Sequence, residues 1–150
     1  MQKTDLKTAI NSYLKNAKMM QLATVSPGGK PWVCNVWFAA DRNMNIYWIS
    51  STNRRHSIEI ANNPHVAASI CLVNDPGESD RGALQIEGIA EQVTNPLEIA
   101  KALKLYTSRG IFSIKQVKSF MADLEYPHKF YRIKPKTIIL FRDGKQSYEL

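Results

Sequence analysis

Hydrophobic and polar positions recur with two different periods along this chain. In residues 4–17 the apolar side chains return every three or four positions, which predicts a helix with one buried face, and Thr4 is placed to cap its first turn. From residue 20 onward, short runs rich in β-branched and aromatic residues take over, separated by turns of proline, glycine, aspartate and asparagine. This pattern predicts three antiparallel strands in a meander, at residues 20–25, 31–40 and 45–51.

The rest of the chain repeats this mixture of strands and helices. Asn53 is placed to cap a short helix that ends before Pro64, and later helices are predicted from caps at Asn95 and Ser113. A polar loop is expected between residues 74 and 82. Gly88, in the middle of a long strand, predicts a bulge or a close backbone approach. The further predicted strands are residues 66–73, 83–93, 130–133 and 137–141.

These elements predict a fold that is mainly β with some α. Six or seven short strands in mostly antiparallel succession leave unpaired edges unless the sheet closes, so the pattern favours a small antiparallel barrel with flanking helices. Such a barrel is filled by its own side chains. Any ligand is therefore expected outside the barrel, in a groove or at a subunit interface.

Composition narrows the class of protein. A length of 150 residues predicts one domain over residues 1–150. Residues 1–18 lack the continuous apolar run and small-residue cleavage site of a secretory leader, and no later stretch approaches ~20 apolar residues, so we expect a cytoplasmic protein without membrane spans. Cys34 and Cys71 fall in apolar runs, where buried packing is the expected role. The three histidines lack metal-ligand spacing, so no metal site is predicted.

Charge favours an anionic partner. The formal net charge is +7, but lysines and arginines are scattered and form no block typical of nucleic-acid tails. The most informative basic segment is residues 50–56, where Arg54, Arg55 and His56 occupy the first turn of the short helix. Cations are unfavourable there unless an anion binds, because a helix start carries unpaired N–H groups and partial positive charge. Either a phosphate binds at this turn, or these are solvated basic side chains.

The order of features resembles the FMN-binding split barrels of the pyridoxamine 5′-phosphate oxidase-like superfamily. The resemblance covers about residues 19–93. It rests on the segment LATV, the turn at residues 27–29, a strand that opens with Pro31, an aromatic third strand, the pair Arg55-His56 and the segment at residues 63–67. The family usually has Arg-Lys at the pair, so Arg55-His56 is closer to the small bacterial subgroup of uncharacterised and general stress proteins.

The resemblance implies a cofactor, a site and an assembly. It implies FMN bound at a homodimer interface, with the second strand along the flavin ring and the end of the third strand near the ring or phosphate. Gln85 and Glu87 on the fifth strand are then expected from the partner subunit. Trp32, like the other tryptophans, is also a candidate for core or interface packing. The implied cofactor-binding residues are Trp32, Cys34, Asn35, Val36, Ser50, Ser51, Thr52, Arg54, Arg55, His56 and Gln85.

The resemblance supports the cofactor more than the reaction. It suggests an FMN-dependent oxidoreductase acting on an unidentified small molecule, with the flavin carrying the chemistry. Oxidases of pyridoxamine phosphate have a longer C-terminal segment with arginines that grip the substrate phosphate, whereas the last ten residues here, FRDGKQSYEL, contain Arg142 as their only arginine. The alternatives are a non-catalytic binder of flavin, haem or another tetrapyrrole, and a basic nucleic-acid-binding barrel, which lacks a recognition motif.

Overall fold

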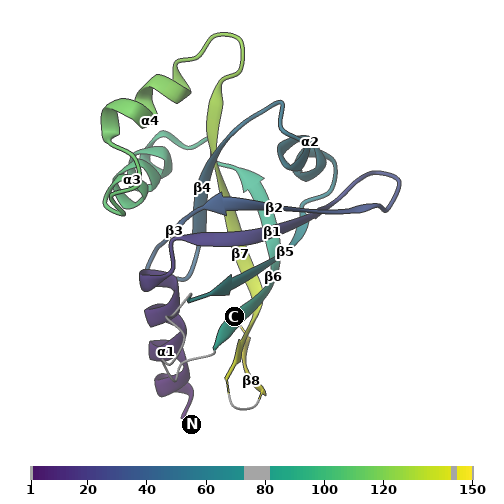
Figure 1. Ribbon diagram of the computed structural model, residues 1–150, viewed down its shortest axis with the longest axis vertical. Helices are drawn as coiled ribbons and strands as arrows, with labels where there is room; N and C mark the ends of the chain where they lie inside the picture. The colour runs from purple at the N-terminus through teal and green to yellow at the C-terminus, as the bar shows by residue number, and fades with distance from the viewer. Residues whose placement is uncertain (1, 73–81, 143–144, 150) are drawn as a thin grey trace.

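In the described part of the chain, one antiparallel sheet is curled into a split barrel with four helices around it (Figure 1). This is a computed structural model that describes residues 2–72, 82–142 and 145–149. The expected class, mainly β with α in an antiparallel barrel, is confirmed. Residues 73–81, most of the predicted polar loop, lie outside the described residues. The strands are β1 (Met19–Val25), β2 (Pro31–Trp37), β3 (Ala39–Ala40), β4 (Ile46–Ser51), β5 (His65–Cys71), β6 (Ala83–Gln92), β7 (His128–Phe141) and β8 (Lys145–Glu149).

The predicted three-strand meander is correct in its pairings and wrong in the continuity of its second strand, residues 31–40. The sheet runs β2-β1-β5-β6-β7-β4-β3, with β8 paired to β7. The predicted second strand is divided into β2, which pairs with β1, and the short β3, which pairs with β4 at the opposite end of the sheet. Between β2 and β4, Phe38 is fully buried and carries the chain across to the other edge. The sheet curls until β2 and β4 come near each other without a ladder of hydrogen bonds. This open seam is the split in the barrel.

β7 is one long strand, although two strands around Pro135 were predicted. The chain tolerates the proline because the ladder between β6 and β7 shifts register between Glu87 and Gly88, and Gly88 pairs with Pro135. A Cβ atom on Gly88 would lie 2.7 Å from the carbonyl oxygen of Lys134. The bulge and close approach predicted for Gly88 are therefore both confirmed.

Helix α1 (Lys3–Asn16) buries Leu6, Ile10, Tyr13 and Leu14 against the barrel core, as its pattern predicted. Its N-cap is Gln2, so the predicted cap at Thr4 is wrong. Helix α2 (Arg55–Asn62) follows β4. Two more helices, α3 (Pro96–Thr107) and α4 (Ile114–Met121), stand beside each other at one side of the sheet (Figure 1).

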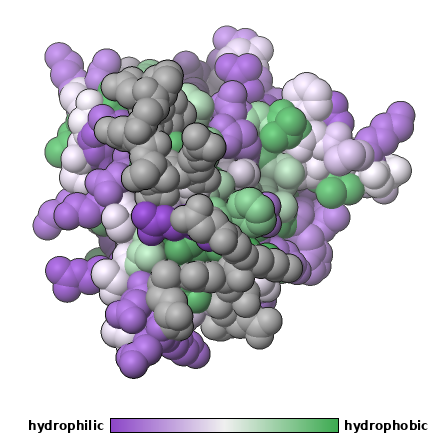
Figure 2. All heavy atoms as spheres, turned by 60° about the horizontal axis from the view of Figure 1, so that its bottom comes forward, coloured by the Kyte–Doolittle hydropathy of each residue, from purple (hydrophilic) through white to green (hydrophobic). Residues whose placement is uncertain are grey.

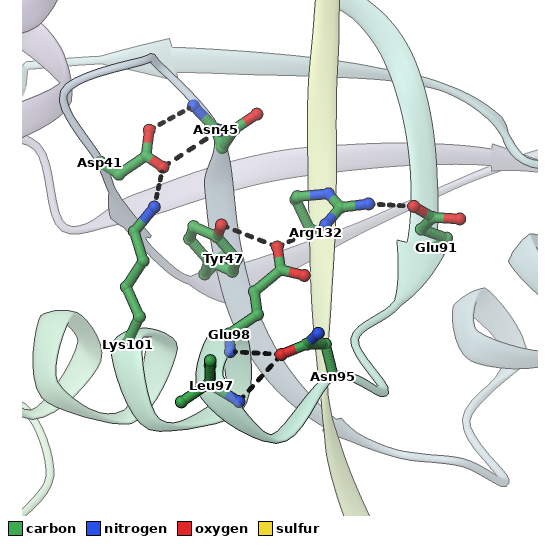
Figure 3. Close-up of polar contacts among 9 residues, drawn as sticks. All are labelled: Asp41, Asn45, Tyr47, Glu91, Asn95, Leu97, Glu98, Lys101 and Arg132. Carbon is green, nitrogen blue, oxygen red and sulfur yellow. Dashed lines mark hydrogen bonds and ion pairs between the residues drawn. The ribbon is translucent and has the colours of Figure 1, made fainter.

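The N-terminal caps of α3 and α4 are the ones predicted from the sequence. The side chain of Asn95 accepts hydrogen bonds from the backbone N–H groups of Leu97 and Glu98, and Ser113 forms a full capping box with Gln116. Glu98 does not close a box on Asn95. Its carboxylate instead binds the Tyr47 hydroxyl and Arg132, which also pairs with Glu91 (Figure 3). This network fastens α3 to β4, β6 and β7.

Two hydrophobic clusters fill the molecule. The larger lies inside the barrel under α1, and the smaller lies between the strands and α3 and α4. Viewed from the end where α1 and β8 lie, hydrophilic side chains form much of the visible edge, with smaller hydrophobic areas between them (Figure 2). Cys71 is exposed and Cys34 half-buried, so the expectation that both are buried is wrong. Among the described helices, none has the length and apolar character needed to cross a membrane.

Candidate functional site

A groove of about 320 Å³ opens where β2, β4 and the start of α2 face α3 and α4. Volumes of this size are typical of small-molecule sites. The groove brings together six residues from the sequence prediction: Asn35, Val36, Ser50, Ser51, Arg54 and His56. The remaining lining residues are Trp37, Ile49, Tyr106, Phe112, Phe120 and His128.

The turn from β4 into α2 sets the polar end of the groove. Ser51 ends the strand, and its carbonyl accepts hydrogen bonds from the backbone N–H of Arg54 (3.2 Å) and from the Ser57 hydroxyl (2.9 Å). Arg54 is the N-cap of α2, and no side chain caps the helix there. Asn53, predicted as the cap, instead accepts a hydrogen bond from the Ser51 hydroxyl at 2.5 Å. The first N–H groups of α2 are thus left without a side-chain acceptor.

His56 lies at the centre of a buried polar chain. Its Nε2 is 2.7 Å from the Ser50 hydroxyl oxygen, and its Nδ1 is 3.4 Å from the sulfur of Cys34. Burial, with a smaller effect of the Arg54 charge, lowers the pKa of His56. Burial also raises the pKa of the Cys34 thiol. A neutral imidazole therefore links a neutral thiol to the groove, and His56 orients its neighbours without carrying a positive charge.

Arg55 is held in one orientation beside the groove. Its Nε donates to Glu59 at 2.7 Å, and its guanidinium carbon lies 4.2 Å from the centre of the Trp32 ring. Burial alone would raise the pKa of Glu59, but hydrogen bonds from Arg55 and Thr24 outweigh it and keep the pKa below its usual range. Among the described residues, the two terminal nitrogens of Arg55 have no hydrogen-bond partner. They remain available for an anion.

The opposite wall of the groove is aromatic and was not predicted. Tyr106 stacks on Phe112 with ring centres 6.2 Å apart, and Phe120 contacts both Phe112 and His128. Nδ1 of His128 is buried and, within the described part of the chain, has no hydrogen-bond partner. These residues lie 50 or more positions after the basic segment. Their aromatic character was the available signal, but the periodicity of α3 and α4 gave no indication that they face a groove.

Five predicted site residues do not line the groove. Cys34 and Arg55 lie directly behind or beside it through their contacts with His56 and the start of α2. Thr52 is in the turn after β4, where its N–H donates to the Pro127 carbonyl. Trp32 is 42% exposed under Arg55. Gln85 is exposed on β6, in a row with Ser69, Gln21 and Asn35 across the outer face of the sheet.

The lowered pKa of His56 predicts a loss of stability in mild acid. A histidine in the unfolded chain titrates near ~6.5. Below that pH the unfolded state binds more protons than the folded state, so stability falls until the pH passes the lower pKa of the folded state. We expect His56→Gln to remove this part of the pH dependence in thermal unfolding between pH 7 and the onset of carboxylate protonation. Exposed His65→Gln is the control, and equal profiles for all three proteins would contradict the prediction.

Comparisons with known proteins agree with this architecture. The family profile described as pyridoxamine 5′-phosphate oxidase matches residues 6–140. A search of curated proteins gave no significant match. At identities of 10–20%, the structural similarities below show the fold alone.

Three of the similar solved structures illustrate the range of proteins with this fold. General stress protein 26 from Bacillus anthracis is 20% identical with a TM-score of 0.70, covering 97% of this chain and 98% of that one. A related protein of the pyridoxinephosphate oxidase family from Clostridium acetobutylicum is 10% identical (TM-score 0.72; 100% and 97%). The haem storage protein HutZ from Vibrio cholerae is 18% identical (TM-score 0.70; 96% and 94%).

Proposed function

Because this chain belongs to the pyridoxamine 5′-phosphate oxidase family, we propose that it is a flavoprotein that binds FMN in the groove between β2, β4 and α2. The observation that carries the proposal is the polar end of the groove. There the uncapped start of α2 coincides with Arg54, which lines the groove, and Arg55, whose terminal nitrogens are unpaired among the described residues. A helix start with two guanidinium groups is a site suited to a phosphate.

The residues present fit the parts of FMN. The phosphate would accept hydrogen bonds from the first N–H groups of α2, Ser51, Arg54 and Arg55. The aromatic wall of Tyr106, Phe112 and Phe120 offers flat apolar surface at the other end of the groove. Asn35 and Val36, on an edge strand, offer backbone groups to a polar ring edge.

The chemistry would come from the flavin, which supplies hydride or electron transfer when bound. The chain's own contribution is to bind and orient. His56 is neutral and fixes the Ser50 hydroxyl at the groove wall, and the aromatic wall excludes water from that side. We propose an oxidoreductase acting on a small molecule, because a bound flavin would carry redox chemistry and the groove has the volume of a small-molecule site.

We also propose that the protein is a homodimer. The outer face of β1, β2 and β5 carries one row of small or apolar side chains: Val33, Ala23 and Ala67 are opposed across the three strands, and Val33 is 60% exposed. Residues opposed across strands share a face, so these positions form one surface. The row that contains Gln85 also contains Asn35, which lines the groove. A partner covering this surface would bring its own Gln85 near the site.

Haem is the second candidate ligand, favoured by one observation. Nδ1 of His128 is buried in the groove wall without a partner in the described residues, and an imidazole nitrogen is a common axial ligand of haem iron. The haem storage protein named above has the same fold. Phosphate-binding groups at the other end make FMN the first choice.

Spectroscopy of the purified protein separates the two ligands. We expect FMN fluorescence to be quenched on binding, with an affinity stronger than that of riboflavin, because only FMN has the phosphate. Titration with haemin is the comparison. The FMN proposal fails if FMN does not bind while haemin gives a stoichiometric Soret complex that His128→Ala abolishes.

A further inference from the structure

A second and larger groove, of about 490 Å³, lies between α1, β3 and α3. In Figure 1 these elements meet at the left of the molecule. This groove is separate from the groove between β2, β4 and α2 that is proposed to bind FMN, called the FMN groove below. Leu105 near the end of α3 and Ser108 and Arg109 just after it line the larger groove, whereas Tyr106 of α3 lines the FMN groove. A smaller hollow that shares four of its residues extends it along α3 toward Lys101. The lining residues are Asn11, Leu14, Lys15, Ala39, Ala40, Asp41, Arg42, Leu105, Ser108 and Arg109.

Polar contacts at the two ends of this groove fix the positions of its walls. At one end, the guanidinium of Arg109 donates to the backbone carbonyls of Leu14, Lys15 and Ala17, at the C-terminal end of α1. A cation is favourable there because the last carbonyls of a helix are unpaired and carry partial negative charge. Arg109 also lies over the ring of Phe38. α3 is therefore fastened to α1.

At the other end, Lys101 of α3 pairs with Asp41 at 2.6 Å (Figure 3). The Asp41 carboxylate is itself fixed, because it accepts hydrogen bonds from the backbone N–H groups of Asn43 and Asn45. The turn between β3 and β4 is thus tied to α3. The groove between the two contacts is preformed, so a ligand that enters it would not have to order the walls.

The unpaired charges at the rim of the groove are positive. Among the described residues that line the groove, Asp41 alone is acidic, and Lys101 neutralises it. Lys15 and Arg42 are exposed at the rim and, among the described residues, neither makes an ion pair. The floor beneath them is apolar, formed by Leu14, Ala39 and Leu105. An apolar floor under a cationic rim is complementary to a molecule with an apolar body and one anionic end.

We propose that this groove is a second ligand site, which binds a small amphipathic anion with its apolar body over Leu14, Ala39 and Leu105 and its acidic group at Lys15 and Arg42. The volume suits a molecule of that kind, because small-molecule sites span roughly 300 to 1,000 Å³. The site does not depend on FMN.

The test uses the anionic dye 8-anilinonaphthalene-1-sulfonate on the full chain, with and without saturating FMN. We expect dye fluorescence to rise on binding, octanoate to displace the dye, and the uncharged octanol to displace it much less. The double variant Lys15→Gln/Arg42→Gln should weaken dye binding about tenfold, since both side chains are exposed and solvent screens each charge-assisted contact with the dye. The control Lys115→Gln/Lys118→Gln removes the same charge from α4 and should leave the affinity unchanged.

Three results would overturn the second site. Equal dye affinity in the two double variants would show that net charge alone attracts the dye. Displacement of the dye by FMN would place the dye in the other groove. A change of oligomeric state in Lys15→Gln/Arg42→Gln, with dye affinity intact, would make the groove a contact between copies of the chain. Since the dye readout needs no flavin, failure of the FMN proposal would leave this test interpretable.

Discussion

Replacing Arg54 and Arg55 together with glutamine is expected to lower the affinity for FMN by roughly 10²- to 10⁴-fold, while riboflavin affinity stays within a few fold. The estimate takes two charge-assisted hydrogen-bond sites at ~1.5–3 kcal/mol each. Riboflavin lacks the phosphate, so a loss confined to FMN reports the phosphate contact alone. The measurement is fluorescence titration of both flavins against wild-type protein and the variant.

Glutamine is chosen because of Glu59. This buried carboxylate accepts from Thr24 and from Arg55, and removing Arg55 entirely would leave Glu59 short of a donor. A buried charge without partners destabilises the fold, which would lower the affinity for every ligand. A glutamine at position 55 can still donate to Glu59. Thermal unfolding of the variant is the control for folding.

The single variants divide the effect between the two side chains. Arg54 lines the groove directly, whereas Arg55 is oriented by Glu59 and the Trp32 ring. A pre-oriented guanidinium loses less side-chain entropy on binding than a free one. We therefore expect Arg55→Gln to account for at least half of the loss. Equal losses for FMN and riboflavin in the double variant would contradict the phosphate assignment.

Local features of this chain were readable from the sequence because they depend on neighbours a few positions apart. The caps at Asn95 and Ser113 and the close approach at Gly88 were all predicted and are present. The residues around the β4–α2 turn were found for the same reason, since Ser50, Ser51, Arg54 and His56 occur within seven consecutive positions. This part of the site was predictable because its residues are close together in the sequence.

Long-range arrangement was predicted less well. The predicted third strand, β4, pairs with the end of the predicted second strand only through Ala39 and Ala40, and its longer partner is β7, whose sequence lies about 80 positions later. Strand periodicity says which side chains share a face and does not say which strands pair. The aromatic wall was missed because α3 and α4 show ordinary amphipathic patterns. Only the folded structure brings Phe112 and His128 opposite Ser50.

The contact between Arg55 and Glu59 was predictable in part from the sequence. The two residues are four positions apart, a spacing at which helical side chains are neighbours, so the ion pair was within reach of sequence reasoning. The effect of this ion pair on the orientation of Arg55 was not predictable from the sequence. Burial of Glu59 against Thr24 of β1, a residue 35 positions earlier, turns an ordinary helical pair into a fixed support for Arg55.

Under the proposed homodimer, replacing Ala67 with arginine is expected to leave the protein a monomer of 17.0 kDa, as measured by light scattering. Ala67 is exposed on β5 and lies between Ala23 and Glu87 on the outer face. In the folded monomer an arginine there points to solvent and can pair with Glu87, so stability should change by less than ~0.5 kcal/mol. Between two copies, the added bulk and two added charges would face each other without solvent.

The same variant tests whether the partner completes the flavin site. If residues such as Gln85 of the second copy contribute to binding, Ala67→Arg should lose FMN affinity together with the dimer, although no groove residue has changed. Ala122→Arg is the matched control, because Ala122 is exposed at the end of α4, away from this face. A monomeric Ala67→Arg that keeps full FMN affinity would show that one chain holds the cofactor alone. A dimeric Ala67→Arg would place the interface on another surface.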